Sequence, residues 1–127
     1  MSDVKILIFV ESRYKVNRKK VKETIELVLA RKNITSPTEV SLAFVGDRKM
    51  HSLNKKFRNL DKTTNILSFP LSEGEQTHLP SDRLRLGDIV ISYPEMIKES
   101  VRDEMMVDDK INFFVEHGLL HLLGEHH

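Results

Sequence analysis

Three histidines near the carboxyl end constrain this chain more than any other feature. His117 and His121 are four residues apart, and Gly124 stands three residues before His127. Residues four apart on a helix share one face, so the first two imidazoles can bind one metal ion. A glycine that ends a helix in a left-handed turn lets the chain reverse, which can bring His127 to the same ion. Three imidazoles suit zinc and leave its fourth position to a water that ionises near neutral pH.

The spacing of these residues matches the long zincin motif, His-Glu-x-x-His-x-x-Gly-x-x-His, with one departure. Gly118 stands where a zincin protease has the glutamate that acts as general base. The pattern therefore favours hydrolytic chemistry on a substrate other than a peptide, and a metalloprotease is the least favoured function.

Other interpretations of the histidines stay open on sequence grounds. The segment around them is rich in leucine, so His117 or His121 could be an ordinary buried histidine bonded to the backbone. The third ligand could be His126 or the terminal carboxylate, because chain ends fray. A terminal pair of histidines can also be the remnant of a purification tag. The spacing favours a metal site with His127 as the third ligand.

Length and composition indicate one domain, 1–127, built around one core. With 39% hydrophobic and 31% charged residues, the chain has the composition of a water-soluble globular protein. No apolar run approaches the ~20 residues of a membrane span, so no membrane association is expected. The chain has no cysteine, so a transition metal must be held by histidine and carboxylate. The lack of cysteines and of a recognisable signal peptide favours the cytoplasm.

Hydrophobic periodicity predicts strands and helices in alternation, which indicates an α+β fold with four strands. The expected strands are Val4–Val10, Thr38–Val45, Asn65–Pro70 and Ile89–Ser92. The expected helices run from Arg18 to about Lys32, from Asp47 to about Phe57, from Tyr93 to about Asp103, and onward from about Asp108. A long surface loop is expected from Leu71 to Leu86. The first strand, helix and strand imply a right-handed crossover and a parallel pair.

Capping signals support three of the helix starts. Asn17 is the expected N-cap of the first helix, and Asp47 that of the second. Ser92 and Glu95 form a capping box at the start of the third helix, with Pro94 inside its first turn.

Basic residues gather in two stretches, although the net charge is only +1. The first basic cluster consists of Lys15, Arg18, Lys19, Lys20 and Lys22. The second basic cluster consists of Arg48, Lys49, Lys55, Lys56, Arg58 and Lys62. Basic surfaces attract phosphate backbones. A solvated helix face explains the first cluster equally well, whereas the amides and hydroxyls beside the second favour a functional role.

Within the second basic cluster, Arg58 can grip a phosphate by two parallel hydrogen bonds, while Lys55 and Lys56 can act as point charges. Phe57 is expected to face the core, although stacking on a base is conceivable. Asp88 can either orient a ligand histidine or shape a Gly-Asp turn, and the sequence does not separate the two roles.

Three blocks of the chain resemble the signature of the YbeY-type rRNA maturation factors, which are single-strand-specific endoribonucleases. They lie in Leu53–Pro70, in Leu86–Ser92 and in His117–His127. With the four expected strands, the resemblance implies a mixed sheet with helices on both sides and a zincin-like metal helix at the C-terminus. This chain departs from the family pattern at Glu125-His126, where the family usually has Tyr-Asp. The family pattern also usually continues with a further C-terminal segment after the position of His127.

The resemblance also implies a site and a role. One zinc ion per chain would be held by His117, His121 and His127, and the functionally important arginine of the family matches Arg58. The implied role is processing of ribosomal RNA, chiefly at the 3′ end of the small-subunit rRNA, and quality control of ribosomes. The implied partners are single-stranded RNA, including rRNA, and the small ribosomal subunit with its proteins.

The favoured hypothesis is a zinc-dependent endoribonuclease in which Arg58 and His117 are catalytic. Lys55 and Lys56, together with Arg58, would bind the substrate. The sequence identifies no general base, and metal-bound hydroxide could act directly. The alternative is a non-catalytic ribosome assembly factor whose zinc is structural and has four protein ligands.

Overall fold

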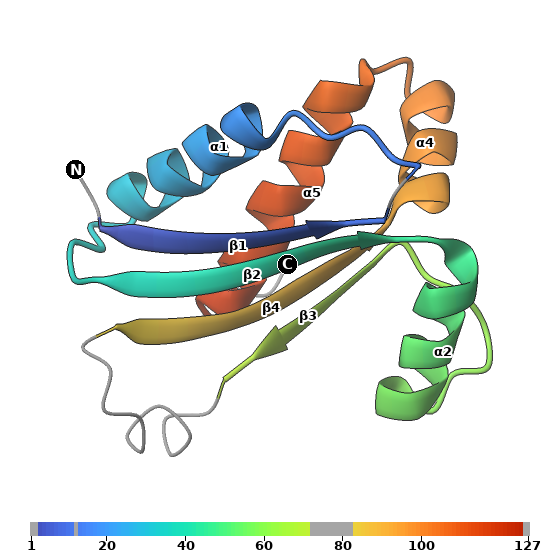
Figure 1. Ribbon diagram of the computed structural model, residues 1–127, viewed down its shortest axis with the longest axis horizontal. Helices are drawn as coiled ribbons and strands as arrows, with labels where there is room; N and C mark the ends of the chain where they lie inside the picture. The colour runs from blue at the N-terminus through green and yellow to red at the C-terminus, as the bar shows by residue number, and fades with distance from the viewer. Residues whose placement is uncertain (1–2, 12, 72–82, 126–127) are drawn as a thin grey trace.

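The computed structural model describes residues 3–11, 13–71 and 83–125. The strands within these residues form one sheet of order β1-β2-β4-β3 (Figure 1). They are β1 (Val4–Val10), β2 (Thr38–Val45), β3 (Ile66–Pro70) and β4 (Leu84–Ser92). β1, β2 and β4 are parallel, and β3 runs antiparallel to β4. The predicted mixed sheet and the predicted parallel pair are both confirmed.

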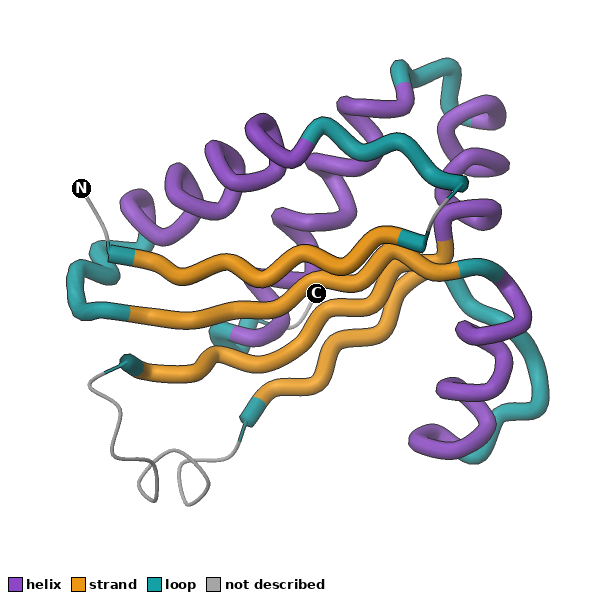
Figure 2. The backbone as a smooth tube through the Cα atoms, viewed as in Figure 1, coloured by secondary structure: helices purple, strands orange, loops and turns teal. Residues whose placement is uncertain are grey.

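Helices cover both faces of this sheet, as predicted (Figure 1). They are α1 (Arg18–Arg31), α2 (Asp47–Arg58), α4 (Tyr93–Arg102) and α5 (Val107–Leu122). α1 and α5 pack on one face, and α2 packs on the other. Figure 2 shows that α2 follows β2, and α4 follows β4, with almost no connecting chain. No helix in the described ranges combines the length and the apolar character needed to span a bilayer.

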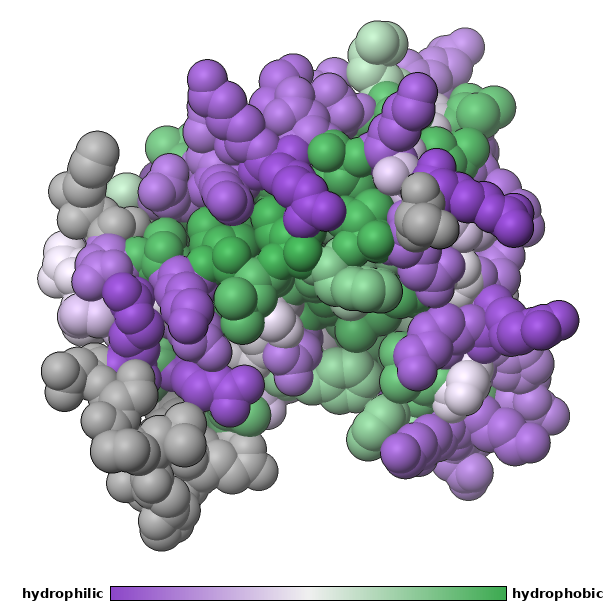
Figure 3. Space-filling model, in the orientation of Figure 1, coloured by the Kyte–Doolittle hydropathy of each residue, from purple (hydrophilic) through white to green (hydrophobic). Residues whose placement is uncertain are grey.

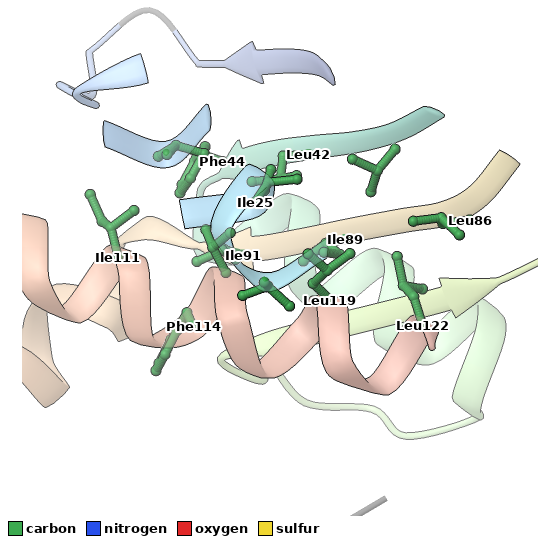
Figure 4. Packing of buried hydrophobic residues seen from close by; sticks show 14 of the residues in the cluster. Ile25, Leu42, Phe44, Leu86, Ile89, Ile91, Ile111, Phe114, Leu119 and Leu122 are labelled. Carbon is green, nitrogen blue, oxygen red and sulfur yellow. The ribbon is translucent and has the colours of Figure 1, made fainter. Parts of the chain in front are cut away.

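The larger hydrophobic core lies between the sheet and the α1–α5 layer. Ile25 of α1, Phe44 of β2, Ile91 of β4 and Leu119 of α5 are all fully buried in it. Figure 4 shows these side chains converging from four elements. Because β4 is central and α5 lies across it, this core fixes where α5 sits on the sheet. A smaller cluster around Met50 packs α2 on the opposite face.

One face of the sheet is only partly covered near β1, the strand at the edge opposite β3. Leu7 and Phe9 on this strand are 46% and 59% exposed, whereas their neighbours Ile6 and Ile8 pack against the larger core. Figure 3 shows a continuous apolar area in this view, bordered by hydrophilic side chains. Phe9 is thus an exposed aromatic residue on the opposite edge of the sheet from β3.

Two of the three predicted caps are confirmed, and the cap at Asp47 is wrong. The side chains of Asn17 and Ser92 each accept a hydrogen bond from a backbone N–H in the first turn of their helix. In α2 the N-cap is Gly46, and Asp47 is already helical. The Asp47 carboxylate instead accepts hydrogen bonds from the hydroxyls of Ser92, at 2.7 Å, and Thr63, at 3.4 Å. Contacts from neighbouring segments therefore replace the local cap.

β4 begins at Leu84, earlier than predicted, so the end of the predicted surface loop is part of the sheet. Adjacent residues of β2 pair with Arg85 and with Gly87, which leaves Leu86 as the extra residue of a β-bulge. Gly87 has a φ of +139°, a value that favours glycine. The bulge interrupts the alternation of side chains between the two faces of the sheet, which is the pattern that identifies a strand in a sequence. The remainder of the predicted loop, 72–82, lies outside the described residues.

The predicted reversal after the last helix is confirmed up to Glu125. Gly124 has a φ of +89° and donates its N–H to the carbonyl of His121 at 3.0 Å. The N–H of Glu125 donates to the carbonyl of Leu120, also at 3.0 Å. These two bonds form a Schellman motif, which ends the helix and turns the chain back. The carboxylate of Glu125 then forms an ion pair with Lys32 at 2.6 Å.

Gly118 marks the closest approach of α5 to the sheet. A Cβ atom at this position would lie 2.9 Å from Cγ2 of Ile89 and 3.1 Å from Cδ1 of Ile66. These two isoleucines belong to the adjacent strands β4 and β3. Because real Cβ atoms essentially never come within 3.0 Å of another heavy atom, a side chain here would force α5 or the isoleucines to shift.

We expect Gly118→Ala to lower the free energy of unfolding by on the order of 1 kcal/mol. Overpacking lowers the free energy of unfolding by about 1–3 kcal/mol. The better helix propensity of alanine offsets about 1 kcal/mol of this loss. Gly118→Glu should lose more, because it adds the same Cβ and a longer side chain. Urea denaturation measures both.

A second substitution tests whether steric overlap with Ile66 causes the loss of stability in Gly118→Ala. Ile66→Val removes the Cδ1 methyl and should cost about 0.5–1.5 kcal/mol in the wild-type chain. In the Gly118→Ala background it should cost less, because it relieves one of the close contacts. Additive losses would show that the helix does not touch the sheet here.

Candidate active-site cleft

A cleft of about 420 Å³ opens at the outer edge of β3, between the end of α2 and the C-terminal part of α5. Three segments that are distant in sequence line it. The described lining residues are Phe57, Arg58, Ile66, Leu67, Ser68, Phe69, His117, Gly118 and His121. The structure thus brings together the predicted arginine and two of the three predicted histidines.

The free edge of β3 forms the floor of this cleft. The carbonyl of Asn65 and the N–H of Leu71 make hydrogen bonds to the β4 side, at 2.9 and 3.3 Å. In an antiparallel pair, alternate residues direct their backbone polar groups to opposite sides of the strand. The backbone groups of Ile66 and Ser68 therefore point away from β4. Pro70 is the next residue whose backbone faces away from β4. Because proline has no N–H, it cannot donate a hydrogen bond to a further strand, which limits pairing at this edge.

Ser68 orients one of the predicted ligands. Its Oγ lies 2.6 Å from Nδ1 of His121, across the gap between β3 and α5. With Nδ1 engaged by the hydroxyl, Nε2 is the ring nitrogen that can bind a metal. Sequence reasoning missed this residue. The only signal for it was a serine in an apolar strand, two positions from Ile66 and so on the same face.

His117 lies on the exposed side of α5, one turn before His121. Its ring stacks on that of Phe113, with centroids 6.4 Å apart and planes inclined by 20°. The two histidines share the helix face that borders the cleft, as their spacing predicted. The interpretation of either one as a fully buried structural histidine is wrong, because His117 is exposed and His121 is half-buried.

A complete metal-ligand set is not contained in the described part of the chain. His127, the predicted third ligand, and His126, its alternative, lie outside the described residues. Within residues 3–11, 13–71 and 83–125, no group of three His, Cys, Asp or Glu side chains could hold a metal ion. The two described donors fit zinc, since imidazoles four residues apart border one cleft and a hydroxyl fixes one ring.

Arg58 reaches the cleft because α2 ends there. Asn59 adopts the left-handed conformation, with a φ of 59°, and its N–H donates to the carbonyl of Lys55 at 3.1 Å. The loop that follows is held by the fully buried Asn54, whose Nδ2 donates to the carbonyl of Lys62 at 2.9 Å. Arg58 itself is exposed, and no ion pair between it and another described residue is formed. Its guanidinium is therefore available to an anion in the cleft.

Lys55 and Lys56 flank the cleft rather than line it. Both are exposed on the solvent side of α2, and neither is among the described lining residues. The ammonium of Lys56 lies 5.2 Å from the ring centroid of Phe57, which does line the cleft. The first basic cluster spans the first turns of α1 and the segment just before it, and none of its residues borders the cleft.

Two expectations about neighbouring residues are wrong. Phe57 does not face the core, because it is 56% exposed. Asp88 neither orients a described histidine nor forms a turn, because it lies within β4 and accepts a hydrogen bond from Ser41. Side chains of a strand alternate between faces, and the next residue, Ile89, packs in the core under α5. Asp88 therefore lies on the face opposite the histidines.

Comparison with known proteins identifies relatives over most of the chain. The profile of the family described as Endoribonuclease YbeY matches residues 8–127. A protein of that name from Syntrophus aciditrophicus is 37% identical over 110 residues, which are 87% of this chain and 64% of the relative. One from Acinetobacter baumannii is 33% identical over 119 residues, which are 94% of this chain and 75% of the relative. This chain thus spans just under two thirds of the first relative and three quarters of the second.

The fold is also similar to that of a solved structure. A protein from Thermotoga maritima, determined in solution, superimposes with a TM-score of 0.61 at 24% identity. The superposition covers 98% of this chain and 74% of the other. The family profile includes all three segments that line the cleft. With a match that extends over nearly the whole sequence, this chain belongs to the YbeY family.

Proposed function

We propose that this chain is a metal-dependent endoribonuclease that cuts single-stranded RNA. Its proposed role is maturation of ribosomal RNA, at the 3′ end of the small-subunit rRNA, and quality control of ribosomes. Membership of the YbeY family supports the activity, since the relatives carry the name endoribonuclease. The observation that supports the site most directly is the single cleft that Arg58, His117 and His121 border.

Arg58 is the proposed phosphate-binding residue. An exposed guanidinium at the rim of a cleft can hold two oxygens of a phosphodiester through parallel hydrogen bonds. The same contacts would strengthen as charge develops on those oxygens in the transition state. Lys55 and Lys56, which flank the cleft, would attract the adjoining backbone as point charges.

His117 and His121 are the proposed ligands for zinc, with His127 as the third. When bound there, zinc would supply a Lewis acid and a water that ionises near neutral pH. Ser68 would hold the Nδ1 proton of His121, so that Nε2 keeps its lone pair directed at the ion. His117 is the proposed catalytic member, because it is the more exposed of the two described histidines.

The packing at Gly118 argues against a protease. A zincin protease needs a glutamate at this position, and a Cβ there would lie 2.9 Å from Ile89. A non-catalytic assembly factor with structural zinc has no comparable observation in its favour. The proposed partners are single-stranded rRNA and the small ribosomal subunit with its proteins, which places the proposed site of action in the cytoplasm.

We expect Arg58→Ala to reduce single-turnover cleavage of a short single-stranded RNA by about 10²–10³-fold, because one set of transition-state contacts is lost. Arg58→Lys should recover only part of the rate, since an ammonium cannot bind in the forked geometry. Arg13→Ala is the control, because Arg13 is exposed and follows β1 at the other edge of the sheet. Full activity in Arg58→Ala would remove this arginine from the mechanism.

Ser68→Ala should weaken zinc affinity by about 10–100-fold, as loss of a hydrogen bond to a ligand histidine usually does. Competition with a chromophoric chelator measures the affinity directly and does not depend on RNA cleavage. The matched control is Ser41→Ala, which removes a hydroxyl bonded to Asp88 on the other face of the sheet. Equal zinc affinities in the two variants would exclude Ser68 as a positioning residue.

Tag-free protein should bind one zinc ion per chain. His117→Ala and His121→Ala should each abolish tight binding, because a site with one imidazole fewer loses a coordinating bond. His127→Ala and His126→Ala should differ, and only the former should lose the ion. Native mass spectrometry measures the stoichiometry of all variants. Zinc that is bound tightly but supports no RNA cleavage would favour the structural-zinc alternative.

A further inference from the structure

Phe57 is an apolar residue that stays largely open to solvent at the end of α2. It is 56% exposed, and its neighbour in sequence, Arg58, borders the same cleft. Single exposed apolar residues are common on protein surfaces and need no explanation by themselves. Phe57 differs from them because it lines a cleft together with a cation and two histidines.

The ring of Phe57 is held in place from within the cleft. Phe69 of β3 packs against it in a T-shaped arrangement, with ring centroids 5.3 Å apart and planes at 64°. Phe69 in turn packs against the smaller core that holds α2 on the sheet. The ring is thus supported by the sheet while more than half of the residue stays open to solvent.

The contact with Lys56 leaves the ring accessible. The ammonium of Lys56 lies 5.2 Å from the ring centroid. Lys56 is itself exposed, so its flexible side chain can move away when a flat group arrives. The ammonium then remains within reach of a phosphate beside that group.

β3 separates the two ends of the cleft. Ser68 directs its side chain to His121 and the α5 face, whereas Phe69 directs its ring to Phe57 and the α2 face. Since β3 is an edge strand, a ligand that crosses its free edge can contact both sides at once. A nucleotide has this shape, with a charged phosphate on one side of the sugar and a flat base on the other.

We infer that Phe57 is a stacking platform for one unpaired base next to the scissile phosphate. This inference rests on the proposed function and deepens it, because it names what selects single-stranded RNA. Stacking of a base on a side chain requires that the base be splayed out of a helix. A duplex keeps its bases stacked on each other, so it cannot offer one to Phe57 while a phosphate meets Arg58.

The first test is a cycle of two changes, one in the protein and one in the RNA. Single-stranded oligonucleotides are prepared with one base-free ribose at successive positions around the cut. For wild type, one position should lower kcat/KM by about 5–150-fold, the range expected for loss of one base–aromatic contact. Phe57→Leu should show a similar loss on intact RNA and no further loss at that position. Phe57→Tyr, which keeps an aromatic ring, should retain the sensitivity of wild type to a base-free ribose at that position.

A matched control excludes general effects of removing an exposed ring. Phe9 is 59% exposed on β1, at the opposite edge of the sheet. Phe9→Leu should leave cleavage of every oligonucleotide unchanged. If Phe57→Leu keeps the full sensitivity of wild type to each base-free position, the inference is wrong, although the endoribonuclease assignment survives.

Binding gives a second readout that does not need cleavage. A 2-aminopurine at the sensitive position should lose fluorescence when wild type or Phe57→Tyr binds, because stacking on an aromatic ring quenches it. Phe57→Leu should not quench it. Wild type that binds and quenches without cutting RNA would contradict the proposed enzyme and leave the stacking role standing. Equal quenching by Phe57→Leu and wild type would overturn the stacking role.

Discussion

The close approach of α5 to strands β3 and β4 at Gly118 is the constraint on which the cleft depends. A Cβ atom here would crowd isoleucines of both strands, so the absence of a side chain lets the helix lie close against the sheet. The histidines on either side of Gly118 are thereby held beside β3, and His121 comes within hydrogen-bonding distance of Ser68. The same missing side chain removes the glutamate of a zincin protease. One residue thus serves the packing and restricts the chemistry.

The position of β3 gives the cleft its two different walls. Because β3 is the edge strand and runs antiparallel to β4, its outer side has no strand neighbour among the described residues. Alternation along the strand sends Ser68 toward α5 and Phe69 toward α2. A polar wall and an aromatic wall therefore lie on either side of one strand. The same strand at the centre of the sheet would keep these two side chains apart from any common ligand.

Local patterns predicted those parts of the fold that local physics decides. The strand spans of β1 and β2 and the caps at Asn17 and Ser92 follow from periodicity and from side chains a few residues away. Asp47 has the same local signal, yet hydroxyls from two other segments bind its carboxylate. β4 was predicted too short because the bulge at Leu86 interrupts its alternation. Both errors, the cap at Asp47 and the start of β4, come from contacts with distant segments, which a short stretch of sequence does not contain.

The errors at the cleft have a common physical origin. Helix periodicity turns Phe57 toward the sheet, but α2 reaches the edge strand and no further strand among the described residues covers its last turn. Ser68 interrupts an apolar strand, and its partner His121 is 53 residues away. In each case a local rule is broken where the sheet ends, and natural proteins break such rules mainly at functional sites. An exposed phenylalanine at the end of α2 and a half-buried serine on β3 therefore lie in the same cleft as the histidines.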